Sequence, residues 1–189
     1  MVRLHRALAQ SYNQSTARLG LELGPERVVD TIHRLGVERE VPALPSVAPG
    51  AVALSPIEVA EMYQTIASGG FSSPLSGIRE VMDASGEPLT RYPVAVEQKV
   101  RQSAVYLLEY ALREVVSSGT ARSAYNRLPA GLVVAGKTGT TDDQRDSWFA
   151  GYTGDRLAVV WIGRDDNQPI QMTGAGGAMT VWGEMMARL

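Results

Sequence analysis

The sequence predicts a mixed α+β fold in which helices come first and an antiparallel strand meander follows. Apolar residues recur at helical spacing in the first third of the chain, whereas three short β-rich runs lie close together after Gly131. Short polar connections separate these runs, which favours antiparallel neighbours. The 189 residues are 44% hydrophobic and 20% charged, as expected for one globular core, and no linker divides them.

Helical patterns dominate the first seventy residues. The first pattern is interrupted near Ser11, where serine and asparagine can cap backbone groups in a short loop. Gly24-Pro25 and Gly36 bracket the next helix, and Ser55-Pro56 begins another with a capping serine and a proline in the first turn. The predicted helices cover residues 2–8, 16–21 and 26–35, then run from Pro56 to the terminator Gly69-Gly70; a proline-rich connection occupies residues 42–50.

The strands are predicted after residue 77, together with two more helices. Residues 78–91 alternate around a polar turn at residues 83–86, which indicates a hairpin. A helix over residues 102–116 ends at Ser117-Ser118-Gly119, and a last helix covers residues 178–189. The β-rich runs predict three adjacent antiparallel strands near residues 131–140, 147–153 and 156–163, flanked by helices.

Composition excludes several classes of function. The 18 basic and 20 acidic side chains nearly cancel, so bulk charge gives no reason to expect a nucleic-acid partner. Cysteine is absent, which excludes a thiol nucleophile, an iron–sulfur cluster and a thiolate zinc site. The longest strongly apolar run, residues 157–163, is far too short to cross a bilayer. We expect no cofactor, and no segment of the sequence predicts a membrane span.

The densest cluster of unusual residues is residues 136–142, directly after an apolar run. Lys137 is one of only two lysines and lies where a strand should be largely buried, so its charge needs a partner or a purpose. Thr138 and Thr140 alternate around Gly139, which places both hydroxyls on one side of a strand and leaves room for a ligand near the backbone. This edge strand could hold a carboxylate and a developing oxyanion. An isolated Lys-Thr-Gly is more often an exposed turn.

A second element, Ser11-Tyr12-Asn13, lies far upstream. On its own, a serine two residues before an asparagine usually marks a cap or turn. Serine acyl-transfer sites, however, combine a Ser-x-x-Lys, a Ser-x-Asn type of element and a Lys-Thr-Gly. Two of the three are present in that order, and the combination is far more specific than either part.

With these motifs the chain resembles the transpeptidase domain of class A penicillin-binding proteins, over nearly its whole length. The most specific parts are residues 136–152 and residues 161–169. The other matching segments are residues 7–13, 54–60, 66–70 and 118–121. The resemblance implies the penicillin-binding transpeptidase and serine β-lactamase type of fold. It also implies that a serine attacks the D-Ala-D-Ala end of a peptidoglycan stem peptide and passes the acyl group to an amine, and that β-lactams acylate the same serine.

The resemblance also implies roles for the matching residues. Ser11 would relay a proton to the leaving nitrogen, and Asn13 would hydrogen-bond the bound peptide. Lys137 would supply positive potential, Thr138 and Thr140 would bind the terminal carboxylate, and the Thr140 amide would form half of an oxyanion hole. The family places this chemistry on the periplasmic face of the bacterial inner membrane.

The nucleophile motif is missing. A Ser-x-x-Lys must end at a lysine, and valines (Val96 and Val134) stand three residues before Lys99 and Lys137. The two histidines lie in helical patterns without catalytic neighbours. We therefore expect residues 1–189 to be the C-terminal portion of one transpeptidase domain, inactive alone, with the nucleophile and first strands encoded upstream. Apolar surface left uncovered by the missing strands should favour self-association.

Two weaker candidate sites and two alternative functions remain. Residues 174–177 are glycine-rich but lack a phosphate-binding pattern, so a flexible lead into the last helix is the better interpretation. Four aspartates (Asp142, Asp143, Asp165 and Asp166) have no histidine or cysteine nearby and are better interpreted as solvated turn carboxylates than as a metal site. The alternative functions are a D,D-carboxypeptidase or β-lactamase relative, and a non-catalytic module that binds peptidoglycan or a cell-wall partner.

Overall fold

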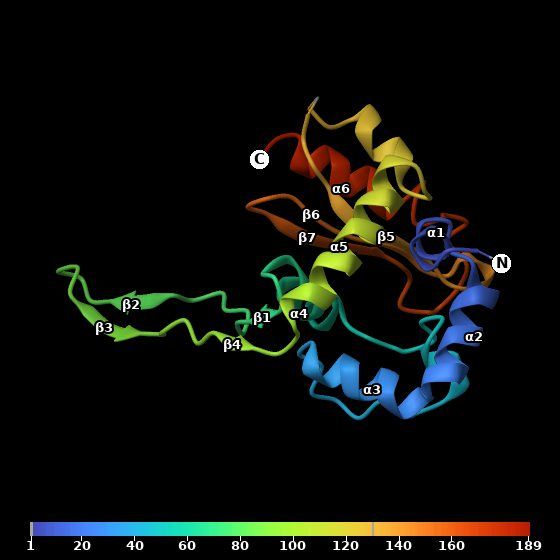
Figure 1. Ribbon diagram of the computed structural model, residues 1–189. Coiled ribbons are helices and arrows are strands. Elements are labelled where there is room, and N and C mark those ends of the chain that lie inside the picture. The colour runs from blue at the N-terminus through green and yellow to red at the C-terminus, as the bar shows by residue number, and fades with distance from the viewer. Residues whose placement is uncertain (1, 130) are drawn as a thin grey trace.

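A three-stranded antiparallel sheet organises the computed structural model, which describes residues 2–129 and 131–189 (Figure 1). Its strands are β5 (Ala135–Thr140), β6 (Ser147–Tyr152) and β7 (Leu157–Ile162), in the order β5-β6-β7. Lys137 pairs with Ala150, and Phe149 pairs with Val160. The mixed α+β class and the three late strands are confirmed.

The first of these strands begins later than predicted. Residues 132–134 lie outside β5, because β6 ends at Tyr152, the partner of Ala135, and offers nothing further to pair with. Gly131 has a positive φ of 85°, and Leu132 donates to the Pro129 carbonyl at 3.3 Å, so this stretch leaves a turn before the strand starts. Val134 is nevertheless buried beside the strand.

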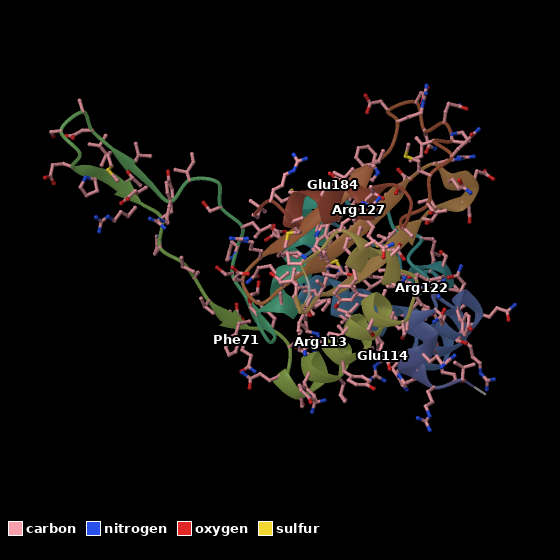
Figure 2. The ribbon with its side chains drawn as sticks, turned by 90° about the horizontal axis from the view of Figure 1, so that it is seen from above. Phe71, Arg113, Glu114, Arg122, Arg127 and Glu184 are labelled. Carbon is pink, nitrogen blue, oxygen red and sulfur yellow. The ribbon has the colours of Figure 1, made fainter. Side chains whose placement is uncertain are left out.

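Helices α5 (Gln102–Ser117), α6 (Ala178–Met186) and α4 (Pro56–Ala67) pack on the sheet. Trp182 of α6 and Phe149 of β6 meet edge to face at 5.0 Å in the fully buried core, and the indole also donates to the Ala158 carbonyl at 3.1 Å. Arg127 and Glu184 form an ion pair at 3.8 Å that joins the segment before the sheet to α6 (Figure 2). The last helix ends at Met186, three residues earlier than predicted.

The N-terminal helices follow the predicted order. They are α1 (Leu4–Ala9), α2 (Asn13–Leu23) and α3 (Pro25–Arg34), and the interruption falls at residues 10–12. A 3-10 turn, Pro45–Val47, lies in the proline-rich connection. Ser55 caps α4 in a reciprocal capping box with Glu58, whose carboxylate accepts from the Ser55 amide at 2.7 Å. No described helix is both long and apolar enough to cross a membrane.

The predicted hairpin is present and projects from the body as an arm (Figures 1 and 2). Its strands are β2 (Glu80–Met82) and β3 (Pro88–Arg91), and the short pair β1 (Phe71–Ser72) and β4 (Glu97–Gln98) closes its base. Asp83 holds the tip by accepting from the Ser85 and Glu87 amides at 2.8 and 3.0 Å.

Candidate functional site

The structure brings the two predicted motifs together. Lys137 Nζ on β5 donates to Ser11 Oγ at 2.7 Å and to the Thr138 carbonyl at 3.0 Å, although 126 positions separate Ser11 from Lys137. Ser11 is exposed and Lys137 is half-buried, so the pair faces solvent at the edge of the sheet. The structure therefore places the Ser11 loop beside the Lys137 strand.

Ser11 is held by the end of α1. Its backbone has a left-handed φ of 56°, and its amide donates to the Leu8 carbonyl at 3.1 Å while Tyr12 donates to Ala7 at 2.9 Å. These bonds close the C-terminal turn of the helix and direct the chain out of it.

A turn at residues 118–120 docks against the same helix end. Thr120 donates from its amide to the Ala9 carbonyl at 3.0 Å, and Gln10 Nε2 donates to the Ser118 carbonyl at 3.2 Å. A Cβ at Gly119 would lie 2.2 Å from the Ala9 carbonyl oxygen, so this contact needs glycine. The turn follows α5, which packs on β5, and it thereby connects the Ser11 segment to the sheet.

Thr120 is a residue of the site that the sequence did not single out. Its Oγ1 lies 2.8 Å from Thr138 Oγ1, so the two hydroxyls share a hydrogen bond. The only sequence signal was the match of residues 118–121 to the resembled family, which carried no assigned role.

Thr140 and Gly139 contact the loop ahead of α6. The Gly174 amide donates to Thr140 Oγ1 at 2.9 Å, which leaves that exposed hydroxyl free to donate its own proton. A Cβ at Gly139 would meet the Trp148 side chain at 3.0 Å. Packing on the neighbouring strand therefore accounts for this glycine, in addition to the ligand space expected from the sequence.

The glycine-rich loop at residues 174–177 is closely docked, so the prediction of a flexible lead into the last helix is wrong. A Cβ at Gly174 would lie 2.5 Å from the Gly139 carbonyl oxygen and 2.7 Å from that of Trp148. The buried Ser147 hydroxyl donates to the Thr173 carbonyl at 2.8 Å and accepts from the Ala178 amide at 2.9 Å. The loop thus forms a tight layer behind β5 and β6.

Asn13 occupies the first position of α2 and is exposed. Its side chain has no hydrogen-bond partner among residues 2–129 and 131–189. Unlike Ser11, it is therefore not hydrogen-bonded to Lys137. Its amide remains open to solvent, two positions from Ser11.

The electrostatics of the site centre on Lys137. Burial lowers the pKa of Lys137 from 10.5 to about 8, because the half-buried ammonium loses hydration. None of the ion pairs formed within the described parts of the chain includes this residue. A half-buried cation with neutral oxygen partners and two hydroxyls nearby suits an anionic ligand such as a carboxylate.

The aspartates weighed as metal ligands lie exposed in turns. Asp143 pairs with Arg145 at 3.1 Å, and Asp166 pairs with Arg164 at 2.6 Å. The hydrogen bonds from Arg164 lower the pKa of Asp166 to about 2. Arginine partners occupy two of these carboxylates, which fits the interpretation as solvated turn residues.

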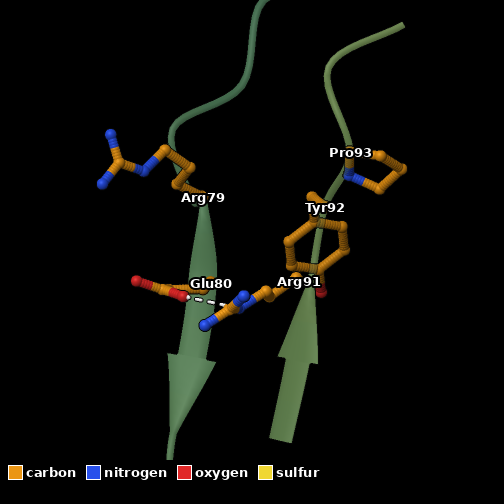
Figure 3. Close-up of a pocket in the computed structure, with 5 residues that line it drawn as sticks. All are labelled: Arg79, Glu80, Arg91, Tyr92 and Pro93. Atoms are coloured by element: carbon orange, nitrogen blue, oxygen red, sulfur yellow. Dashed lines mark hydrogen bonds and ion pairs between the residues drawn. The ribbon is translucent and has the colours of Figure 1, made fainter. Parts of the chain in front are cut away.

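A separate hollow lies on the arm, away from the predicted site residues. It lies at the end of the two hairpin strands opposite the tip, and it is lined by Arg79, Glu80, Arg91, Tyr92 and Pro93 (Figure 3). An ion pair between Glu80 and Arg91 crosses the strands at 3.1 Å. The hollow holds none of the motif residues.

Comparisons with known proteins show the family. Residues 1–181 match the family model described as the penicillin binding protein transpeptidase domain. Penicillin-binding protein 1B of Vibrio cholerae is 44% identical over 186 residues, covering 98% of this chain and 24% of the relative. Penicillin-binding protein 1B of Escherichia coli is 41% identical over 187 residues, covering 98% and 22% respectively.

Solved structures confirm the fold. Penicillin-binding protein 1A from Haemophilus influenzae superposes with a TM-score of 0.91 at 22% identity, over 99% of this chain and 34% of that one. PonA1 from Mycobacterium tuberculosis, solved in complex with penicillin V, gives a TM-score of 0.82 at 24% identity, over 99% and 56%.

The chain therefore belongs to the penicillin-binding protein transpeptidase family, as its motifs predicted. It spans about a quarter of the length of the curated relatives that it matches.

Proposed function

We propose that this chain supplies the Ser-x-Asn and Lys-Thr-Gly elements of a serine D,D-transpeptidase, which cross-links peptidoglycan stem peptides and is acylated by β-lactams. The observation that carries the proposal is the 2.7 Å hydrogen bond from Lys137 to Ser11, between motifs far apart in sequence. A half-buried ammonium beside a hydroxyl can promote the movement of a proton to a leaving nitrogen.

The residues divide into two groups in this proposal. Ser11 relays the proton and Asn13 hydrogen-bonds the amide of the bound peptide. Lys137 attracts the terminal carboxylate, which the hydroxyls of Thr138 and Thr140 bind. Because β5 is an edge strand, alternate backbone amides point away from β6, and the Thr140 amide is our candidate for one half of the oxyanion hole.

We further propose that residues 1–189 are the C-terminal part of the catalytic domain, with the Ser-x-x-Lys nucleophile upstream. Support comes from the two lysines, neither of which ends such a motif, and from the open edge of β7. The strand sequence of β7, Leu-Ala-Val-Val-Trp-Ile, is wholly apolar, and the unpaired backbone groups of an edge strand invite another strand. We propose that upstream strands of the same domain add there, and that chains lacking them self-associate.

The location follows from the same proposal. Peptidoglycan stem peptides lie outside the cytoplasmic membrane, so the domain would act on the periplasmic face of the inner membrane, held by an anchor outside residues 1–189. Nucleic acid has no part in this function, and the described site requires no metal.

Acylation of the full-length protein that contains this chain tests the proposal. Fluorescent penicillin should label the wild type, and Lys137→Ala should lower the acylation rate about 10²–10³-fold without unfolding the domain. Lys99→Ala is the matched control, since Lys99 lies at the base of the arm in an ion pair with Glu97 at 2.6 Å. Near-normal acylation of Lys137→Ala, with an unchanged melting temperature, would overturn the assignment of this strand.

The products separate the alternative functions. A transpeptidase should form cross-linked muropeptides from stem peptides, whereas a D,D-carboxypeptidase releases D-alanine without cross-links and a β-lactamase hydrolyses penicillin with turnover. A full-length protein that binds stem peptide but forms no acyl-enzyme would establish the binding module instead.

A further inference from the structure

Thr120 contacts both halves of the candidate site. Its amide donates to the Ala9 carbonyl at 3.0 Å, two residues before Ser11, and its Oγ1 lies 2.8 Å from Thr138 Oγ1 on β5. The backbone contact positions the Ser11 segment, and the side-chain contact reaches the Lys-Thr-Gly strand. No other described hydroxyl makes a hydrogen bond with Thr138 Oγ1.

The direction of the hydroxyl–hydroxyl bond matters, because each threonine has one hydroxyl proton. If Thr138 donated to Thr120, its proton would be unavailable to a ligand. If Thr120 donates to Thr138, the Thr138 proton can point to an anion beside Lys137, and its donor strength increases through hydrogen-bond cooperativity.

We propose that Thr120 is a positioning residue whose hydroxyl donates to Thr138 and so orients the Thr138 proton toward the carboxylate of a bound stem peptide or β-lactam. This inference rests on the proposed function, since it assigns a role to Thr120 within that site. Thr120 itself is half-buried, and it acts through its hydrogen bond with Thr138.

The geometry permits a clean substitution. Thr120→Val keeps the side-chain shape and the amide bond to Ala9 but removes the hydroxyl, whereas Thr120→Ser keeps the hydroxyl. Loss of one hydrogen bond in a relay to a charged ligand should slow acylation about tenfold. Thr31→Val is the matched control, because the Thr31 hydroxyl donates to the Arg27 carbonyl within α3 at 2.9 Å, outside the site.

The test is the second-order rate constant for acylation of the full-length protein by benzylpenicillin, measured for these variants, Thr138→Val and the double variant. We expect Thr120→Val and Thr138→Val to be slow, Thr120→Ser to recover most of the rate, and Thr120→Val to have no further effect in the Thr138→Val background. Such non-additivity is the signature of two residues that act through one interaction.

The contrary outcomes are distinct. A normal rate for Thr120→Val together with a slow Thr138→Val overturns the role of Thr120 and leaves the proposed function intact. Additive effects, or no recovery in Thr120→Ser, show that Thr120 acts only through packing. Absence of acylation in the wild type overturns the proposed function itself, and with it this inference.

Discussion

Lys137 Nζ donates to Ser11 Oγ at 2.7 Å, and this contact joins the loop after α1 to β5, an edge strand of the sheet. Burial without a carboxylate partner holds the pKa of Lys137 at about 8. The charge of this side chain is therefore responsive to pH and to any anion that binds beside it.

The first prediction concerns the titration of Lys137. Its side-chain NMR signals should titrate with a midpoint near pH 8, and a bound carboxylate ligand should raise the pKa because the anion favours the ammonium form. With only two lysines in the chain, Lys99→Arg assigns the spectrum. A Lys137 midpoint near 10.5 would contradict the burial described for this side chain.

A second prediction links the same residue to stability. The unfolded chain holds the Lys137 proton up to pH 10.5 and the folded chain releases it near pH 8, so the unfolded state binds more protons between these values. The free energy of unfolding should therefore rise with pH across this window. Chemical denaturation at about pH 7.5 and about pH 10 should show a smaller rise for Lys137→Met than for the wild type or Lys99→Met.

The third prediction concerns the loop that packs behind β5. In Gly174→Ala the new methyl group would lie 2.5 Å from the Gly139 carbonyl oxygen, and two strand backbones cannot move aside cheaply. The free energy of unfolding should fall by about 1–3 kcal/mol, as for other overpacked sites. Gly154→Ala is the control, since a methyl group at Gly154 would have no neighbour within 4 Å. Equal denaturation midpoints for the two variants would show that the loop is loosely docked.

The sequence predicted the elements well where local signals dominate. Ser55-Pro56 with Glu58 predicted the start of α4, and the alternation around Asp83 predicted the hairpin. The start of β5 was placed too early, because an apolar run predicts burial but the length of its partner strand decides where pairing begins. Val134 shows the difference between burial and pairing, because it is buried but lies outside the strand.

The site shows a different limit. Motif combination identified Ser11 and Lys137, but only the fold could bring them within hydrogen-bond distance. Thr120 was not predicted, because a threonine after Ser-Gly at a helix end carries no local sign of its contact with Thr138. Gly174 was interpreted as flexible for the same reason, since a close approach of distant backbone leaves no trace in neighbouring residues.

The last prediction concerns residues 1–189 expressed alone, which should not be covalently labelled by fluorescent penicillin. Acylation requires a nucleophile activated by a nearby base, and neither lysine of the chain ends a Ser-x-x-Lys motif. Ser11 is the one serine of the described residues whose hydroxyl is bonded to a lysine, at 2.7 Å, and Lys137 is donating to that oxygen rather than accepting its proton. Intact-protein mass spectrometry should show the unmodified mass after incubation with penicillin at about pH 7.

Repeating the incubation at about pH 9, where Lys137 is largely neutral, tests whether this lysine can become the base. An adduct that disappears in Ser11→Ala would make Ser11 a nucleophile and would remove the need for an upstream serine.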